Sequence, residues 1–220
     1  MTDNPIILLV VLPLAAYVLG STPFGVLLAK AHGMDLRKVG SGNVGATNVA
    51  RALGRKWGYI CFLLDTGKGL TAVLVAGLLL RRLESFPTLL HQASWLGVGC
   101  GVILGHVFSF YLRFRGGKGV ATALGVVVGI YPYFTFAGLA ALGVWIVVVL
   151  LTKYVSLASL AAAGAFLPLF AAFNWPVAHV WPLVAFAAVM VALIVLRHRD
   201  NIRRLIAGTE NRIGARHSDE

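Results

Sequence analysis

The chain has 220 residues, of which 59% are hydrophobic and 12% are charged, and its formal net charge at pH 7 is +11. Soluble domains are about 45–50% apolar and about 25% charged, so this composition excludes an ordinary soluble protein and predicts an integral membrane protein. The basic residues stand in short clusters between apolar runs, which is typical of cytoplasmic loops and argues against a nucleic-acid partner.

Six apolar runs approach or exceed the roughly 20 residues that a membrane-spanning helix needs. In chain order they cover residues 5–29, 57–80, 92–112, 119–151, 155–173 and 177–197. The fourth run has no charge between Lys118 and Lys153. As one helix it would be about 50 Å long, against a hydrocarbon core of about 30 Å. Because Pro132 near its middle would break or kink a helix, the run is either one tilted span or two short ones.

The positions of the basic residues favour two short spans. With seven spans and the N-terminus outside, 16 of the 19 Lys and Arg residues are cytoplasmic: six in residues 30–56, four in residues 113–153 and six after residue 196. With six spans, the first loop and the tail would face opposite sides. The positive-inside rule therefore predicts an all-α integral membrane protein with seven transmembrane helices, the N-terminus outside and the C-terminus cytoplasmic. Residues 1–220 form a single membrane domain in this interpretation.

The tail over residues 198–213 is predicted to contain a short amphipathic helix at the cytoplasmic interface. Ile202, Leu205 and Ile206 fall on one helical face, with arginines on the other. Gly208 follows and is typical of a helix end.

The first polar motif is "GSGNVGATNVAR", residues 40–51. Its glycines resemble a dinucleotide fingerprint, but that motif requires a preceding strand, and this one lies between two predicted spans. Glycines such as Gly42 let backbone amides approach an anion, and a following helix N-terminus would add positive potential. Ser41 and Asn43 add hydrogen-bonding groups, and Arg51 adds a bidentate cation. The motif predicts an anion site; the alternative is a plain cytoplasmic turn.

The second polar motif is "RGGKG", residues 115–119. Gly116, Gly117 and Gly119 offer flexible backbone amides beside Lys118, which is typical of a phosphate-binding loop although the Walker A spacing is absent. The alternative is a basic membrane anchor with a flexible turn. His106, near the end of the preceding span, is either a packing residue or a functional one.

A third polar feature lies inside the second predicted span. Asp65 and Lys68 are three residues apart, so they can pair on one helical face. A lone charge near the bilayer centre costs roughly 2.5–3.5 kcal/mol on insertion scales. The sequence leaves a structural ion pair and a functional role equally open.

Further polar residues fall on the predicted cytoplasmic side, namely Ser156, His198, Asn201 and Glu210. Several polar segments suited to anions would thus share one face, which predicts a phosphate-bearing ligand. No metal site or cofactor is predicted, because the eight acidic residues do not cluster and the two cysteines stand alone in apolar runs.

Four stretches resemble the bacterial membrane acyltransferases of the PlsY family, which acylate glycerol 3-phosphate from acyl phosphate: "GSGNVGATNVAR", "GHVFSFYLRFRGGKGVATALG", "KYVSLASL" and "HRDNIRRLIAGTE". The resemblance implies seven spans in the bacterial inner membrane, a cytoplasmic active site, and lysophosphatidic acid and phosphate as products. It implies catalytic roles for Ser41, Arg51, Lys118, His198 and Asn201. It implies substrate or phosphate contacts for Gly42, Asn43, Gly116, Gly117, Gly119, Ser156 and Glu210.

The motifs that are missing bear on the mechanism. The chain has no H-x-x-x-x-D pair and no G-x-S-x-G nucleophile elbow. The expected mechanism is therefore direct transfer in a ternary complex, with the donor's phosphate accepting the proton. The expected partners are acyl phosphate, glycerol 3-phosphate and the lipid bilayer, and a contact with the enzyme that supplies acyl phosphate is left open. The alternative function is a transporter of a phosphorylated solute, with Asp65 and Lys68 as an intramembrane switch.

Overall fold

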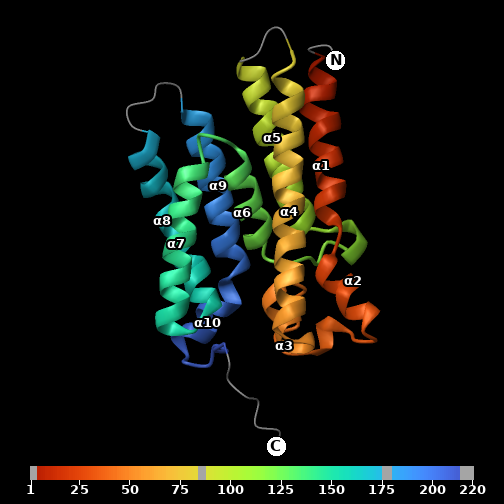
Figure 1. Cartoon of the computed structure of the whole chain (residues 1–220), viewed down its shortest axis with the longest axis vertical. Coiled ribbons are helices and arrows are strands. Elements are labelled where there is room, and N and C mark those ends of the chain that lie inside the picture. The colour runs from red at the N-terminus through yellow and green to blue at the C-terminus, as the bar shows by residue number, and fades with distance from the viewer. Residues whose placement is uncertain (1–3, 84–87, 175–179, 214–220) are drawn as a thin grey trace, which may run out of the picture. The chain divides into compact units, whose positions relative to one another are not determined.

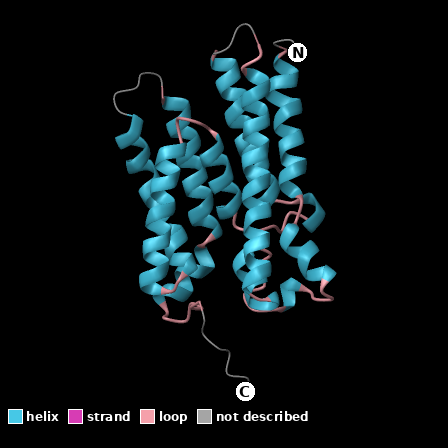
Figure 2. Cartoon of the chain, viewed as in Figure 1, coloured by secondary structure: helices cyan, strands magenta, loops and turns pink. Residues whose placement is uncertain are grey.

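The structure is a computed structural model that describes residues 4–83, 88–174 and 180–213. Every regular element in these ranges is helical, as the sequence predicts (Figure 2). The chain divides into two compact units, Met1–Thr135 and Phe136–Glu220. The single membrane domain over residues 1–220 stays a prediction. Arg216, one of the basic residues assigned to the cytoplasm, lies outside the described residues.

In the described residues, the first unit begins with a π-helical turn and includes two 3₁₀ turns among its α-helices. Figure 1 labels the α-helices along the chain. In chain order its elements are η1 (Ile7–Val11), α1 (Leu12–Ser21), α2 (Phe24–Ala31), η2 (Leu36–Lys38), α3 (Ala46–Leu53), α4 (Arg55–Leu80), α5 (Leu89–Val107), η3 (Phe110–Leu112) and α6 (Val120–Gly129). The second unit is formed by α7 (Thr135–Thr152), α8 (Val155–Asn174), α9 (Trp181–Arg197) and α10 (Arg199–Ile206).

Glycines hold the long helices of the first unit close together. A Cβ on Gly101 or Gly105 of α5 would overlap backbone oxygens of α1, and a Cβ on Gly20 of α1 would overlap the backbone of α5. Small residues allow such close approach in membranes, where apolar side chains gain little by leaving the lipid. A polar tie adds to this packing, because Trp95 of α5 donates from Nε1 to the backbone oxygen of Val73 on α4 at 2.7 Å. The first unit is therefore a tight helical frame.

The fourth apolar run contains two helices, as the seven-span interpretation requires. α6 and α7 are separated by residues 130–134, which include Pro132. The break has a local cause, because proline removes a backbone donor and clashes with the preceding turn. α6 has 10 residues, so at the helical rise it is about 15 Å long, roughly half the thickness of a hydrocarbon core.

Five helical stretches of the described chain are long and apolar enough to cross a membrane, and a sixth is counted if α9 and α10, which meet at 56°, form one span. The five are Ile7–Ala31, Arg55–Leu80, Leu89–Leu112, Thr135–Thr152 and Val155–Asn174. Many large apolar side chains point outward, and Leu151 of α7 is 79% exposed, which suits a lipid-facing surface. The all-helical architecture is confirmed for the described residues, whereas seven spans and their orientation stay predictions.

Two short polar helices form where the sequence predicts them. α3 begins at Ala46, directly after the glycine-rich stretch. α10 ends at Ile206, and Gly208 follows with a φ of +71°. In this left-handed conformation the chain turns back, and Thr209 N donates to Arg204 O at 2.8 Å, which satisfies one of the last carbonyls of the helix.

Candidate active site

The first glycine-rich loop takes its shape from Asn48, a buried residue of α3. Its side-chain nitrogen donates to the backbone oxygens of Leu36 at 3.0 Å and Val39 at 2.9 Å, and its side-chain oxygen accepts from Ser41 N at 3.0 Å. Gly40 has a φ of +57°, a region that favours glycine. Asn48 therefore folds the loop onto α3 and leaves Ser41 exposed. Asn48 belongs to the first polar motif, but the sequence did not reveal this role.

Arg51 follows in the last turn of α3, and its side chain is exposed. The Asn48 contacts fix the loop that carries Ser41 and Asn43 against the helix that carries Arg51. The structure therefore brings these predicted residues onto one small loop–helix element. A hydroxyl, an amide and a guanidinium on such an element are suited to a phosphate group.

The second glycine-rich loop is anchored to the end of α5. Gly116 N donates to Val107 O at 3.0 Å, and Gly117 N donates to His106 O at 3.1 Å. These two amides are thus engaged within the protein, whereas the sequence predicted that they would face an anion. The charged groups of the loop are the exposed Arg115 and the partly buried Lys118.

Arg37 joins the two loops, a role that the sequence did not reveal. It lies in η2, and its Nη2 donates to the backbone oxygens of Leu112 and Arg115, each at 3.3 Å. Leu112 also packs against the small core beneath the first loop, which includes Leu36 and Val49. Within the first unit, the glycine-rich loop that precedes α3 and the glycine-rich loop 115–119 are therefore parts of one surface.

A cleft of about 530 Å³ lies between α2, the segment from Gly33 to Arg37 and the segment from Tyr111 to Arg113. Three cationic side chains, those of Lys30, Arg37 and Arg113, line it together with the single carboxylate of Asp35. Ser41, Arg51 and Lys118 do not line it. The remaining lining is mainly apolar or aromatic: Val26, Gly33, Met34, Leu36, Tyr111 and Leu112. The cleft combines positive charge with apolar surface, which suits an anionic amphiphile.

A second polar cluster is formed in the second unit around Glu210. Its Oε1 accepts from Ser156 Oγ at 2.9 Å and from Asn201 Nδ2 at 2.7 Å, and its Oε2 accepts from Arg204 Nε at 2.7 Å. The tail after α10 is thereby tied to the start of α8. Three predicted site residues thus meet directly. Arg204 was not named as a site residue, although its position one turn after Asn201 on α10 places both on the same face.

His198 lies at the junction of α9 and α10 and is buried. In the sequence it precedes Asn201 of this cluster by three residues. Its Nδ1 lies 2.7 Å from the backbone oxygen of Ile194. Because a carbonyl can only accept, Nδ1 carries a proton, and in the neutral form of the ring Nε2 is an acceptor. That arrangement is the one used by histidines that orient a hydroxyl or accept its proton.

The Glu210 cluster depends on a charged carboxylate. Burial by itself would raise the pKa of Glu210, but hydrogen bonds from Asn201, Arg204 and Ser156 outweigh it, so the pKa lies below its ordinary range. A lowered folded-state pKa means that the charged form stabilises the fold. This stabilisation is complete above the ordinary glutamate pKa of about 4.3 and is lost as the pH falls through the lower folded value.

Glu210→Gln should remove this acid sensitivity. In detergent at pH 7 we expect the free energy of unfolding of the variant to be lower by about 1–3 kcal/mol, because charge-assisted hydrogen bonds become neutral ones. Below about pH 4 the Tm of the native chain should fall more steeply than that of Glu210→Gln. Asp200→Asn is the matched control, since that side chain is 63% exposed, and its curve should follow the native one. Parallel curves for the native chain and Glu210→Gln would contradict this prediction.

Comparison with known proteins identifies the family. A family model described as glycerol-3-phosphate acyltransferase matches residues 10–208. The chain is 46% identical over 202 residues to the glycerol-3-phosphate acyltransferase of Geotalea daltonii, covering 92% of this chain and 96% of that protein. It is 47% identical over 204 residues to that of Aquifex aeolicus, covering 90% and 95%. The chain belongs to the glycerol-3-phosphate acyltransferase family.

Crystal structures of a family member share the fold. The glycerol 3-phosphate form of PlsY (YgiH), an integral membrane glycerol 3-phosphate acyltransferase, matches with a TM-score of 0.79 and 42% identity, over 93% of this chain and 94% of that one. Its lysophosphatidic acid form matches with a TM-score of 0.77 and 40% identity over the same shares. The PlsY resemblance predicted from the sequence motifs is therefore confirmed, as is the integral membrane class.

The predicted site residues of this acyltransferase fall into two groups. The first unit carries Ser41, Gly42, Asn43, Arg51, Gly116, Gly117, Lys118 and Gly119, on loops joined by Arg37. The second unit carries Ser156, His198, Asn201 and Glu210, of which three share hydrogen bonds. The roles of these residues remain predictions.

Proposed function

We propose that this chain transfers a fatty acyl group from acyl phosphate to glycerol 3-phosphate, giving lysophosphatidic acid and inorganic phosphate. Family membership supports the acceptor and the acyltransfer, and the solved structures of a relative, 42% and 40% identical, are its glycerol 3-phosphate form and its lysophosphatidic acid form. The acyl phosphate donor is part of the proposal. The main structural support is that Arg37 joins the two loops that present Arg51 and Lys118. Both cations therefore belong to one surface, which is suited to two substrates that each carry phosphate.

The proposed mechanism is a direct transfer. The hydroxyl oxygen of glycerol 3-phosphate attacks the acyl carbon, the carbon–oxygen bond to phosphate breaks, and the ester bond forms. The hydroxyl proton leaves with the departing phosphate, so no covalent acyl-enzyme and no cofactor are needed. A mixed anhydride is already activated, which fits a chain that lacks both the H-x-x-x-x-D pair and the nucleophile elbow.

The residues divide the tasks of binding and charge stabilisation. We assign the two cations Arg51 and Lys118 to the negative charge that develops on the leaving phosphate. Ser41 and Asn43 supply hydrogen bonds to phosphate, and His198 and Asn201 orient the acceptor. The glycines of both loops, Gly42, Gly116, Gly117 and Gly119, give the backbone its required shape. Glu210 holds Ser156 and Asn201 in place through the contacts described above.

The choice of donor and the class of protein are tested together. Purified chain should convert glycerol 3-phosphate to lysophosphatidic acid with acyl phosphate, and not with an acyl thioester of the same chain length. The alternative, a transporter of a phosphorylated solute, predicts uptake of labelled glycerol 3-phosphate into proteoliposomes and no new lipid. Product formation only from the thioester would overturn the donor, and uptake without product would overturn the enzyme.

The proposal includes a location and an orientation. We place the protein in the bacterial cytoplasmic membrane, with seven spans, the N-terminus outside, and the active site and residues 198–213 facing the cytoplasm. The basic asymmetry of the sequence supports this orientation. A seventh span requires that α6 cross with the residues that flank it, since α6 alone has 10 residues.

Cysteine labelling tests this orientation. Single cysteines replace Arg55 and Thr209, two exposed positions, in a chain without Cys61 and Cys100. Both should react with an impermeant maleimide only from the cytoplasmic side. A cysteine that replaces the exposed Arg81 is the matched control and should react only from outside. Reaction of positions 55 and 209 from opposite sides would contradict seven spans.

A further inference from the structure

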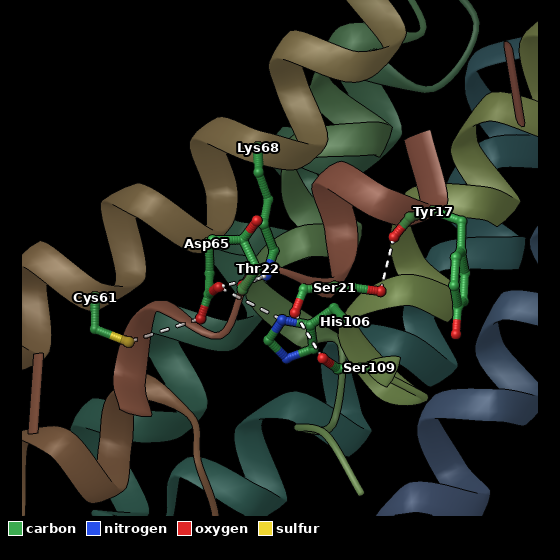
Figure 3. Close-up of polar contacts among 8 residues, drawn as sticks. All are labelled: Tyr17, Ser21, Thr22, Cys61, Asp65, Lys68, His106 and Ser109. Carbon is green, nitrogen blue, oxygen red and sulfur yellow. Dashed lines mark hydrogen bonds and ion pairs between the residues drawn. The ribbon is translucent and has the colours of Figure 1, made fainter. Parts of the chain in front are cut away.

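A charged cluster is buried in the first unit, where α4 meets α5 and the break between α1 and α2 (Figure 3). Lys68 Nζ lies 2.8 Å from Asp65 Oδ1, one turn away on α4. The same oxygen lies 3.4 Å from Nδ1 of His106 on α5. Lys68 also donates to the backbone oxygen of Thr22 at 2.9 Å. His106, the most exposed of the three charged or titratable side chains, is only 9% exposed.

Stability alone is a weak explanation for this cluster. Taking two charges out of water is costly, and replacing a buried ion pair with apolar groups of similar size is often neutral or stabilising. Buried ionisable groups in membrane spans usually mark function. The mechanism proposed above uses none of these three residues directly. Their contacts with neighbouring segments indicate what they do.

His106 connects the cluster to the second glycine-rich loop. Its backbone oxygen accepts from Gly117 N at 3.1 Å. Its ring fills the space beneath the loop, because a Cβ on Gly117 would overlap Nε2 of the imidazole. Asp65 contacts the other nitrogen of the ring, Nδ1. The orientation of one imidazole thus couples the Asp65 carboxylate to the position of Gly117, the residue before Lys118.

α4 also fixes the other end of this loop. Lys118 and Gly119 lead into α6, and α6 packs against α4. The approach is close, because a Cβ on Gly69 would overlap the backbone oxygen of Thr122 on α6. Gly69 directly follows Lys68. The backbone before Lys118 is therefore held by α5 through His106, and the helix that follows Lys118 packs against the segment of α4 that carries the ion pair.

We propose that Asp65, acting through the His106 imidazole, positions the glycine-rich loop 115–119 and so sets the place of the Lys118 ammonium group in the reaction. Asp65, Lys68 and His106 are positioning residues and do not touch the substrate. Lys68 neutralises the carboxylate and ties it to the α1–α2 break. This inference rests on the proposed role of Lys118 at the leaving phosphate.

The first test removes both charges together, since removing one would leave the other buried and unpaired. Asp65→Asn/Lys68→Met should keep a Tm close to the native value. Its kcat should fall about ten- to a hundredfold, because a displaced catalytic group loses rate steeply, while KM for glycerol 3-phosphate changes little. Ser94→Ala is the matched control: Ser94 is buried on α5 and bonds the backbone of Leu8, and its kcat should stay native. A folded double variant with native kcat would overturn the proposal.

The second test asks whether the effect passes through Lys118. Added to Lys118→Ala, the two changes should lower kcat no further than Lys118→Ala alone, because the group that they position is gone. A role in general folding would instead multiply the losses, and that result would overturn the proposal. The native chain is assayed beside the variants. A native chain without product refutes the proposed function, whereas an active native chain with multiplying losses refutes only this inference.

A third measurement reports on the imidazole without needing activity. Gly117→Ala should lower Tm, since its Cβ overlaps His106 Nε2. In that background, His106→Asn should restore part of the Tm, because asparagine keeps a donor on the Asp65 side and removes the ring beneath the loop. Additive losses of Tm from the two substitutions would show that the ring does not hold the loop and would overturn the route through His106.

Discussion

Arg51→Ala should lower kcat by about 10²- to 10³-fold, the loss that follows removal of one group that stabilises charge in a transition state. The residue stands in the last turn of α3, exposed, on a loop–helix element held by Asn48. Because Asn48 makes the contacts that fold this element and the Arg51→Ala change leaves Asn48 in place, the variant should remain folded. Steady-state assays with both substrates saturating measure the effect.

Arg51→Lys is the informative second variant. A lysine restores the charge but not the planar fork that binds two phosphate oxygens at once, so it should recover little of the lost kcat. Arg55→Ala is the control, because Arg55 is exposed at the start of α4, four residues away. Full activity of Arg51→Lys would mean that only charge matters there, and native activity of Arg51→Ala would remove Arg51 from the site.

Lys118→Ala should cause a loss of the same size, about 10²- to 10³-fold in kcat. Its position between Gly117 and Gly119, in a loop anchored to α5, presents one ammonium group at the junction with α6. If the lysine acts on the leaving phosphate, kcat should fall more than KM rises. Lys38→Ala, which changes an exposed lysine at the end of η2, should stay near native in kcat. A raised KM with native kcat would make Lys118 a binding group only.

Several features of the fold were predictable because their causes are local. Pro132 interrupts the fourth apolar run, and two helices result. Gly208 ends α10 in a left-handed conformation that glycine adopts without strain. Asp65 and Lys68 pair because three residues of helix place them on one face, as predicted. In each case a backbone preference or a helical spacing was sufficient.

Other features depend on contacts between distant segments. The amides of Gly116 and Gly117 donate hydrogen bonds to backbone oxygens at the end of α5. No spacing in the motif indicates these contacts. The Arg37 bridge joins residues 75 and 78 positions apart. The contact of His106 with Asp65 likewise depends on α5 lying beside α4. Packing of this kind is a property of the folded chain, so the motifs alone do not show which of their groups already bond within the protein.

The most direct test is an initial-rate measurement of lysophosphatidic acid formation, with acyl phosphate and glycerol 3-phosphate both varied. Direct transfer requires both substrates to be bound at once, so double-reciprocal plots at several fixed levels of the second substrate should give intersecting lines, with one phosphate released per lipid formed. No product from acyl phosphate would contradict the function. Parallel lines, with an acyl-protein trapped from acyl phosphate alone, would contradict the mechanism and direct attention to Ser41, Ser156 and His198 as nucleophile and base.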